Sequence, residues 1–229
     1  MARHKDPRQL NGGYQLAMFD TEPEPATPAG PAPAGGQWAK ANGLHLQTGS
    51  AGSAVLSPCG TYRYRLDRVW DEQAPPLVWV MLNPSTADGD EDDATLRRVT
   101  SFSKNAGHGG LTVVNLFALR SRDPRELRRH ADPFGPCNGG ALLDATASST
   151  RIVVAWGDVG RAEAEQARFV TDLLICRGRS LECLGLTRKG RPRHPLYVRD
   201  ETQLTAYAPQ SPIGDRRPAA ATTDQGVKA

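Results

Sequence analysis

The chain has 229 residues and a formal net charge of +3, an excess of cations too small to establish a polyanionic partner by itself. No apolar run approaches the roughly 18 residues of a membrane span, and no apolar stretch follows the charged N-terminus. The four cysteines lack a CxxC spacing, which favours reduced thiols over a metal or cluster site. We therefore expect a cytoplasmic protein without metal, cofactor or membrane anchor, and we expect a monomer.

Composition divides the chain into three parts. Residues 1–52 are rich in Pro, Gly and Ala and poor in branched apolar residues, so they cannot bury enough surface to offset the entropy of ordering. Residues 208–229 have the same character. We expect both segments to be disordered, and we expect residues 53–207 to form one α/β domain with a single core.

Short apolar runs predict strands in the central part, because parallel strands covered on both faces are continuously apolar. Helical patterns separate these runs. They begin at Asp92-Asp93, at Asp123-Pro124 and at about residue 161, and the first and third end at Gly107 and Gly178. The predicted strands span residues 78–82, 111–114, 152–155 and 181–186. This order predicts a three-layer α/β/α sandwich with a mainly parallel four-stranded sheet.

Ligands bind at the carboxyl ends of the strands in such sheets, and the first three predicted strands end in distinctive residues. The amide of Asn83 could hold a water or cap its own turn. Asn115 offers a donor and an acceptor, which suits the edge of a nucleobase, or it could be a structural amide. Trp156 could form a pocket wall or belong to the core, and Gly157 would allow close backbone approach.

The loop after the fourth predicted strand is basic and stiffened by prolines. It carries His194, whose neutral form is favoured by the surrounding positive charge. A neutral imidazole can donate a hydrogen bond to an oxygen that becomes negative in a transition state. The cations of this loop could bind phosphates or could be ordinary solvated charge. These cations are Arg188, Lys189, Arg191 and Arg193.

Two further charged segments bear on partners. The basic residues between 120 and 129 also follow a strand end, so they could share one rim with the late basic loop. The acidic run from Asp88 to Asp93 lacks the remaining positions of a calcium loop, and carboxylates before a helix are also explained by the helix dipole. We therefore expect no metal there, with a metal site as the alternative.

The signatures at the strand ends together resemble the uracil-DNA glycosylase superfamily, in their order and rough spacing. The resemblance covers about residues 56–207. It is carried by Asn83-Pro84, Val113-Val114-Asn115-Leu116, Val153-Val154-Ala155-Trp156-Gly157 and His194-Pro195. It implies a uracil-DNA-glycosylase-like fold and cleavage of an N-glycosidic bond in DNA. It also implies that Asn83 positions the attacking water, that Asn115 recognises the base, and that the loop of His194 stabilises the departing base and enters the DNA.

The chain departs from that superfamily at two places. It has no Gly-Gln-Asp-Pro-Tyr-His segment, so an Asp general base is missing from the first strand, and the His-Pro loop lacks a Ser-Pro-Leu-Ser continuation. Two alternatives to a glycosylase therefore stand. One is a non-catalytic binder of DNA or of a modified nucleotide with a degenerate pocket. The other is an enzyme that acts on free nucleotides.

A second resemblance is to a bacterial family of unknown function, domain of unknown function 1643. It includes Asn83-Pro84-Ser85, and we count Ser85 with Asn115, Trp156 and Gly157 among the candidate substrate-binding residues. The segments that carry it lie at residues 59–64, 81–88, 93–98, 114–118 and 192–197. This resemblance implies no activity.

The N-terminal segment contains a third resemblance. Gln15-Leu16-Ala17-Met18-Phe19 is similar to the short Gln-Leu-x-Leu-Phe peptide by which bacterial repair and replication proteins bind the sliding clamp. A flexible tail suits such a peptide, because apolar anchors there have no core to join. The resemblance implies partner contacts through Gln15, Leu16, Met18 and Phe19, whereas the alternative is an exposed Leu and Phe without a partner.

Overall fold

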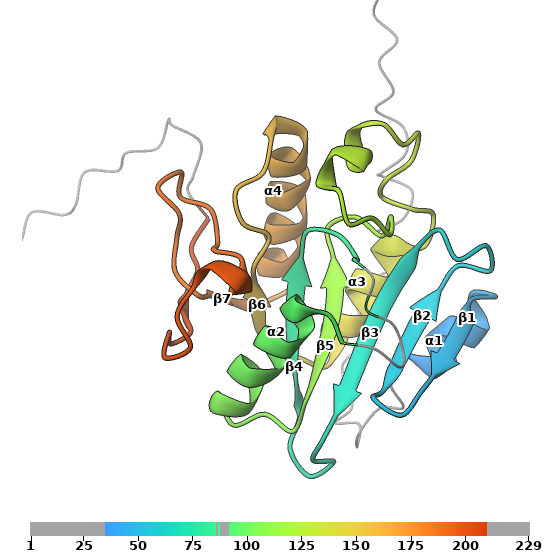
Figure 1. Cartoon of the computed structure of the whole chain (residues 1–229), viewed down its shortest axis with the longest axis horizontal. Helices are drawn as coiled ribbons and strands as arrows, with labels where there is room; N and C mark the ends of the chain where they lie inside the picture. Colours follow the sequence, from blue (N-terminus) through green and yellow to red (C-terminus); the bar gives the residue numbers. More distant parts are fainter. Residues whose placement is uncertain (1–34, 86, 88–91, 210–229) are drawn as a thin grey trace, which may run out of the picture.

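The computed structural model describes residues 35–85, 87 and 92–209 (Figure 1). Its centre is one mixed sheet of eight strands in the order β1-β2-β3-β5-β4-β6-β7-β8. The protein is an α/β protein, but the expected mainly parallel four-stranded sheet is wrong. The strands are β1 (His45–Thr48), β2 (Ser53–Leu56), β3 (Arg63–Val69), β4 (Pro76–Met81), β5 (Gly110–Asn115), β6 (Arg151–Val154), β7 (Ser180–Cys183) and β8 (Thr205–Ala206).

The parallel pairings lie in the middle of the sheet. β4 pairs with β5 and with β6, and β6 pairs with β7, all in parallel. These four strands match the four apolar runs of the sequence. Antiparallel strands extend both edges: β1, β2 and β3 continue from β5, and β8 pairs with β7. Four of the seven pairings in the described sheet are therefore antiparallel.

Helices cover both faces of the parallel strands, because successive side chains of a strand point to opposite faces. Leu77 and Trp79 of β4 pack with α2 (Ala94–Asn105) on one face. Val78 and Val80 pack on the other face, in a cluster with side chains of α3 (Asn138–Ala147) and α4 (Arg161–Cys176). The short helix α1 (Gly36–Ala41) places Trp38 edge-to-face against Tyr64 of β3, 6.2 Å between ring centres.

The expected helix boundaries hold for two of the three predicted helices. Asp93 accepts a hydrogen bond from the Leu96 N–H and caps α2, as predicted. α4 ends at Cys176 and is followed by Gly178 with φ of 73°. The segment after Asp123 is a 3₁₀ turn, Pro124–Arg128, instead of an α-helix.

Part of the segment for which the sequence predicted disorder has fixed structure. α1 and β1 lie before residue 52, and β1 pairs with β2 along all four of its residues. The proposed clamp peptide, Gln15 to Phe19, lies outside the described residues, as does the tail from residue 210. No helix in the described ranges is long and apolar enough to cross a membrane.

Candidate active site at the strand ends

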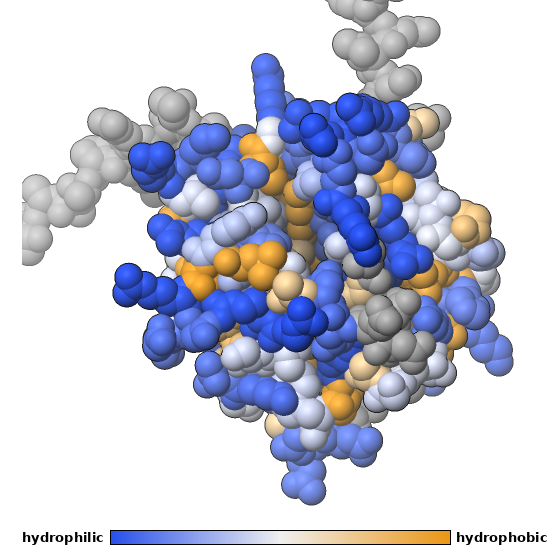
Figure 2. Space-filling view, viewed as in Figure 1, coloured by the Kyte–Doolittle hydropathy of each residue, from blue (hydrophilic) through white to orange (hydrophobic). Residues whose placement is uncertain are grey.

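A cleft of about 960 Å³ lies at the carboxyl ends of the central parallel strands, between their following loops and the N-terminus of α2. In Figure 2 hydrophilic side chains surround a central hollow in which apolar surface shows. All candidate catalytic and base-binding residues line this cleft, and of the four candidate cations of the late basic loop only Arg191 is absent from its lining. The lining candidates are Asn83, Ser85, Asn115, Trp156, Gly157, Arg188, Lys189, Arg193 and His194.

Asn115 is the last residue of β5 and is only 2 % exposed. Its backbone is fixed, because Asn138 at the start of α3 donates from Nδ2 to the carbonyl oxygens of Asn115 and Leu116. The Asn115 side-chain Nδ2 is buried and has no hydrogen-bond partner. A buried donor without an acceptor costs about 1–3 kcal/mol, so this amide is suited to an acceptor atom on a ligand.

Trp156 follows β6 and lines the same cleft. Its indole Nε1 is also buried without a partner. Its ring stands edge-to-face against Tyr207, 6.1 Å between centres, and this contact fixes the indole plane. Trp156 is therefore both a packed core side chain and a wall of the cleft, so the two interpretations from the sequence are compatible.

Gly157 brings the late loop close to the strand ends. Its φ is 76°, a conformation that favours glycine, and a Cβ there would lie 3.2 Å from the His194 Cβ. Its N–H donates to the Pro192 carbonyl oxygen at 2.9 Å. Arg98 of α2 holds the other side of the loop, because it donates to the Pro195 and Val198 carbonyl oxygens and pairs with Asp200.

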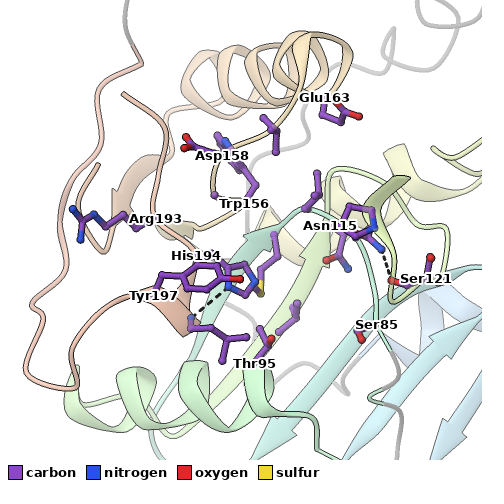
Figure 3. A pocket seen from close by; sticks show the side chains of 18 of the residues that line it. Ser85, Thr95, Asn115, Ser121, Trp156, Asp158, Glu163, Arg193, His194 and Tyr197 are labelled. Atoms are coloured by element: carbon purple, nitrogen blue, oxygen red, sulfur yellow. Dashed lines mark hydrogen bonds between the residues drawn. The ribbon is translucent and has the colours of Figure 1, made fainter. Parts of the chain in front are cut away.

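His194 is half-buried at the start of a 3₁₀ turn, Pro195–Tyr197. The Leu196 N–H donates to its Nδ1 at 3.4 Å, so Nδ1 is an acceptor and the proton of the neutral ring is on Nε2. Burial lowers the pKa of His194 below its usual value, whereas the nearby Asp93 carboxylate raises it. In Figure 3 His194 and Asn115 lie on opposite sides of the cleft.

Asn83 braces two loops, whereas the alternative offered by the sequence was that it caps its own turn. Its Nδ2 donates to the Pro84 carbonyl oxygen at 3.0 Å and to the Ser121 carbonyl oxygen at 2.9 Å. Both amide protons thus join the loops after β4 and β5. Any contact of Asn83 with a water or ligand must therefore be made through its Oδ1, as an acceptor.

Cations from both basic segments line the cleft, as the shared-rim interpretation requires. Arg122 and Arg128 come from the loop after β5, and Arg188, Lys189 and Arg193 come from the loop after β7. With Arg63 these make six cations, against the three carboxylates of Asp93, Asp158 and Glu163 among the described lining residues. The cleft therefore favours an anionic ligand.

Glu163 explains how Arg128 is placed. Glu163 lies in the first turn of α4 and is 4 % exposed, and its Oε1 accepts from Arg128 Nε at 2.8 Å. Burial raises the pKa of Glu163, but hydrogen bonds from Arg128 and from backbone N–H groups outweigh it and the pKa is lowered. The ionised carboxylate thus anchors one cation of the rim.

Several lining residues escaped the sequence analysis. Asp158 directly follows Trp156-Gly157, and its Oδ1 accepts from Thr187 Oγ1 at 2.7 Å, which ties the β6 loop to the β7 loop. Asp93 was predicted as a helix cap, with a metal ligand as the alternative, and not as a residue of this cleft. The sequence offered one signal for two of these residues, namely that each lies close to a predicted site residue. Asp158 follows Trp156-Gly157, and Tyr197 follows His194-Pro195-Leu196.

Metal ligands do not gather in the part of the chain that the structure describes: no three His, Cys, Asp or Glu side chains there could hold an ion. Asp88 to Glu91 of the acidic run lie outside the described residues. Asp92 pairs with Arg68 of β3 at 2.8 Å, so this end of the run is held by a strand. The four cysteines are free thiols.

Comparison with known proteins identifies one family. A family profile described as "Protein of unknown function (DUF1643)" matches residues 63–196, which begin at β3 and end within the His194 loop. The matched segment therefore includes the four parallel strands and every residue of the cleft lining except Tyr197. No curated protein and no solved structure matches the chain.

The first prediction concerns the protonation of His194. Since burial lowers its pKa, we expect the ring to be neutral at pH 7, with the proton on Nε2. Between the folded pKa and the unfolded value near 6.5, the unfolded chain binds more protons. The stability that His194 contributes is therefore complete above about pH 6.5 and is lost as the pH falls towards the folded pKa.

Long-range ¹H–¹⁵N correlation spectra of imidazole-labelled protein measure both properties. An Asp93→Asn variant is the matched control, because Asn also caps helices, and we expect it to lower the His194 pKa further. A His194 that is protonated at pH 7, or that carries its neutral proton on Nδ1, would contradict this account of the site.

Proposed function

Since the chain belongs to the DUF1643 family, whose description gives no activity, we propose from the chemistry of the cleft that it is a hydrolase of N-glycosidic bonds in nucleic acid. The observation that carries the proposal is the composition of one cleft. It combines two buried donors without partners, a neutral imidazole and a cationic rim. An enzyme that releases a base from its sugar needs hydrogen-bond donors at the edge of the base and a group that stabilises the negative charge of the departing base. It also needs cations that bind the phosphates of the strand.

The departing base would be stabilised by His194. When the bond from the sugar to the base nitrogen breaks, the electron pair stays on the base. Negative charge then grows on that ring nitrogen and on the exocyclic carbonyl oxygens conjugated with it. A donor fixed in advance at that place stabilises the developing charge without reorganisation. The neutral tautomer, with Nδ1 accepting from the Leu196 N–H, leaves Nε2–H as this donor.

A carboxylate in the cleft would accept the proton of the attacking water. Asp93 is the carboxylate whose charge acts on His194, which places it near the reacting atoms. Its Oδ1 caps α2, so Oδ2 would receive the proton. Asn83 would orient the same water through its Oδ1, since its amide protons are used in bracing the loops. In this way Asp93 would supply the general base that the first strand lacks.

The base would bind between Asn115 and Trp156. The bond to be cleaved is inaccessible within a stacked duplex, so the nucleotide must be unstacked before it enters the cleft. Asn115 Nδ2 would then donate to an acceptor on the base edge, and the Trp156 indole would form the wall beside it. Arg188, Lys189 and Arg193 would contact phosphates, which position the strand without reading its sequence.

A second function is supported by one observation. Both amide protons of Asn83 are donated to backbone carbonyl oxygens of the loops after β4 and β5, as expected of a residue with a purely structural role. We therefore keep the alternative of a non-catalytic protein that binds DNA or a modified nucleotide in the same cleft. The two functions use the same contacts with the nucleic acid, and they differ in whether a water is activated for attack on the sugar.

The second prediction separates the enzyme from the binder. Purified protein is incubated with oligonucleotides that carry deaminated, methylated or oxidised bases, and strand cleavage by alkali reports each released base. His194→Ala should slow release by about a hundredfold or more, the usual cost of one lost oxyanion donor. Asp93→Asn should slow it severely while preserving the cap of α2. Asn115→Asp should change which base is accepted, because a carboxylate only accepts hydrogen bonds.

The control in this series is Asp144→Asn on α3, which removes the charge of a carboxylate that pairs with Arg65 and does not line the cleft. It should leave the rate of base release unchanged. If the wild-type protein releases no base from any substrate, while Asn115→Asp still alters affinity, the binder is the better description.

The third prediction concerns phosphate contacts. Replacing Arg188, Lys189 and Arg193 together by Ala should reduce the slope of log affinity against log salt by about two to three units, roughly one for each lost contact. Arg151, at the opposite end of β6, is the control, and Arg151→Ala should leave the slope unchanged. An equal slope for the triple variant and the wild type would mean that the loop is solvated surface.

A further inference from the structure

The loop of His194 separates two clefts. A second cleft of about 610 Å³ lies on its other side, and Arg193 and Tyr197 line both. The remaining lining residues of the second cleft are not shared with the first. They come from the end of β7 and from the segment after the 3₁₀ turn: Leu184, Gly185, Leu186, Val198, Arg199 and Thr202.

Tyr197 presents an aromatic ring to solvent at this partition. It is 78 % exposed, and its ring centre lies 5.7 Å from that of His194 (Figure 3). The loop that carries it is nevertheless fixed by the Gly157 N–H on one side and by Arg98 on the other. An exposed aromatic ring on a fixed loop is a platform on which a planar group can stack.

The charge around the second cleft suits a phosphodiester. Arg193 and Arg199 are exposed cations on its lining, and none of its described lining residues is a carboxylate. Of the neighbouring acids, Asp200 pairs with Arg98, and Glu201 is exposed outside the lining. Leu186, 44 % exposed, adds apolar surface to this lining, and its carbonyl oxygen accepts a hydrogen bond from Arg193 Nε at 3.0 Å.

On the basis of the function proposed above, we propose that the second cleft binds the nucleotide next to the target on a single strand. Its base stacks on Tyr197, and Arg193 and Arg199 bind the phosphates on either side. One strand thus passes over the His194 loop and places successive bases in two clefts. Aromatic stacking beside a cationic groove is the usual way in which proteins bind single strands.

The concave form of both clefts favours a single strand over a duplex. In a duplex, the base next to the target remains stacked and paired. It therefore cannot enter the second cleft, on the opposite side of Tyr197 from the target base. An unpaired strand meets neither restriction. The binding of two successive bases in separate recesses therefore selects unpaired nucleic acid.

The fourth prediction is measured by fluorescence anisotropy with the full chain. The probes are a labelled single-stranded oligodeoxynucleotide, the same strand annealed to its complement, and a labelled mononucleotide. Tyr197→Ala should weaken single-strand binding by about five- to a hundredfold, the range for one lost base stack. Tyr197→Trp should restore it. Arg199→Gln should flatten the salt slope by about 0.7 units, the value for one phosphate of a single strand.

The mononucleotide distinguishes the two proposals, because it can occupy the first cleft alone. Tyr197 lines both clefts, whereas Arg199 lines only the second, so Arg199→Gln is the variant tested with the mononucleotide. Equal mononucleotide binding by Arg199→Gln and the wild type, with loss only for the oligonucleotide, supports the second cleft even if no base is ever released. If Tyr197→Ala binds single strands as tightly as the wild type does, or if the wild type binds the duplex more tightly than the single strand, the inference is overturned.

Discussion

The parallel pairing of β5, β4, β6 and β7 is the constraint on which the site depends. It brings the carboxyl ends of four strands to the same end of the sheet, where the loops that follow them leave the ladder. Asn115 pairs with Met81 at the final rung, and the Ala155 N–H donates to the Val80 carbonyl oxygen immediately before Trp156. The register of the ladder, with helices packed on both faces, therefore places the amide and the indole at the floor of one cleft.

Burial then determines the chemistry of that floor. The Asn115 and Trp156 donors are withdrawn from water and have no acceptor, so each is destabilising until a ligand supplies one. The same withdrawal from water lowers the pKa of His194 and keeps a neutral donor at the cleft wall. The cations are placed differently, because most remain at the solvent-exposed rim, where they attract an anion without a large desolvation cost.

The apolar runs predicted the parallel strands and the residues at their ends, because continuous burial on both faces is visible in sequence. The antiparallel strands were not predicted. β3 contains Arg63, Arg65, Asp67 and Arg68 within seven residues, a pattern that does not suggest burial. These charges are buried, and two of their partners are distant in sequence: Asp67 accepts from Thr112, and Arg65 pairs with Asp144 of α3 as well as with Asp67 two residues away.

Contacts between segments far apart in the sequence also determine the site, and these were not predicted. Asn83 was identified, but its bonds to the Pro84 and Ser121 carbonyl oxygens depend on how two loops meet. Asp93 was predicted as the cap of α2, and only the packing of α2 against the His194 loop places its charge near the imidazole. Tyr197 was part of a quoted motif, but its exposure between two clefts is a property of the folded loop alone.

The central claim is that a nucleobase binds at the strand ends, and the four tryptophans allow a direct test. In ¹H–¹⁵N spectra each indole N–H gives one signal, and the Trp156→Phe variant assigns that of the cleft. Trp79 Nε1 donates to Ser103 Oγ and Trp70 Nε1 to the His108 carbonyl oxygen, so these signals report sites away from it. Titration with a single-stranded oligonucleotide carrying a modified base should shift the Trp156 signal and leave those of Trp70 and Trp79 in place. A bound oligonucleotide that leaves the Trp156 signal unmoved would contradict the account.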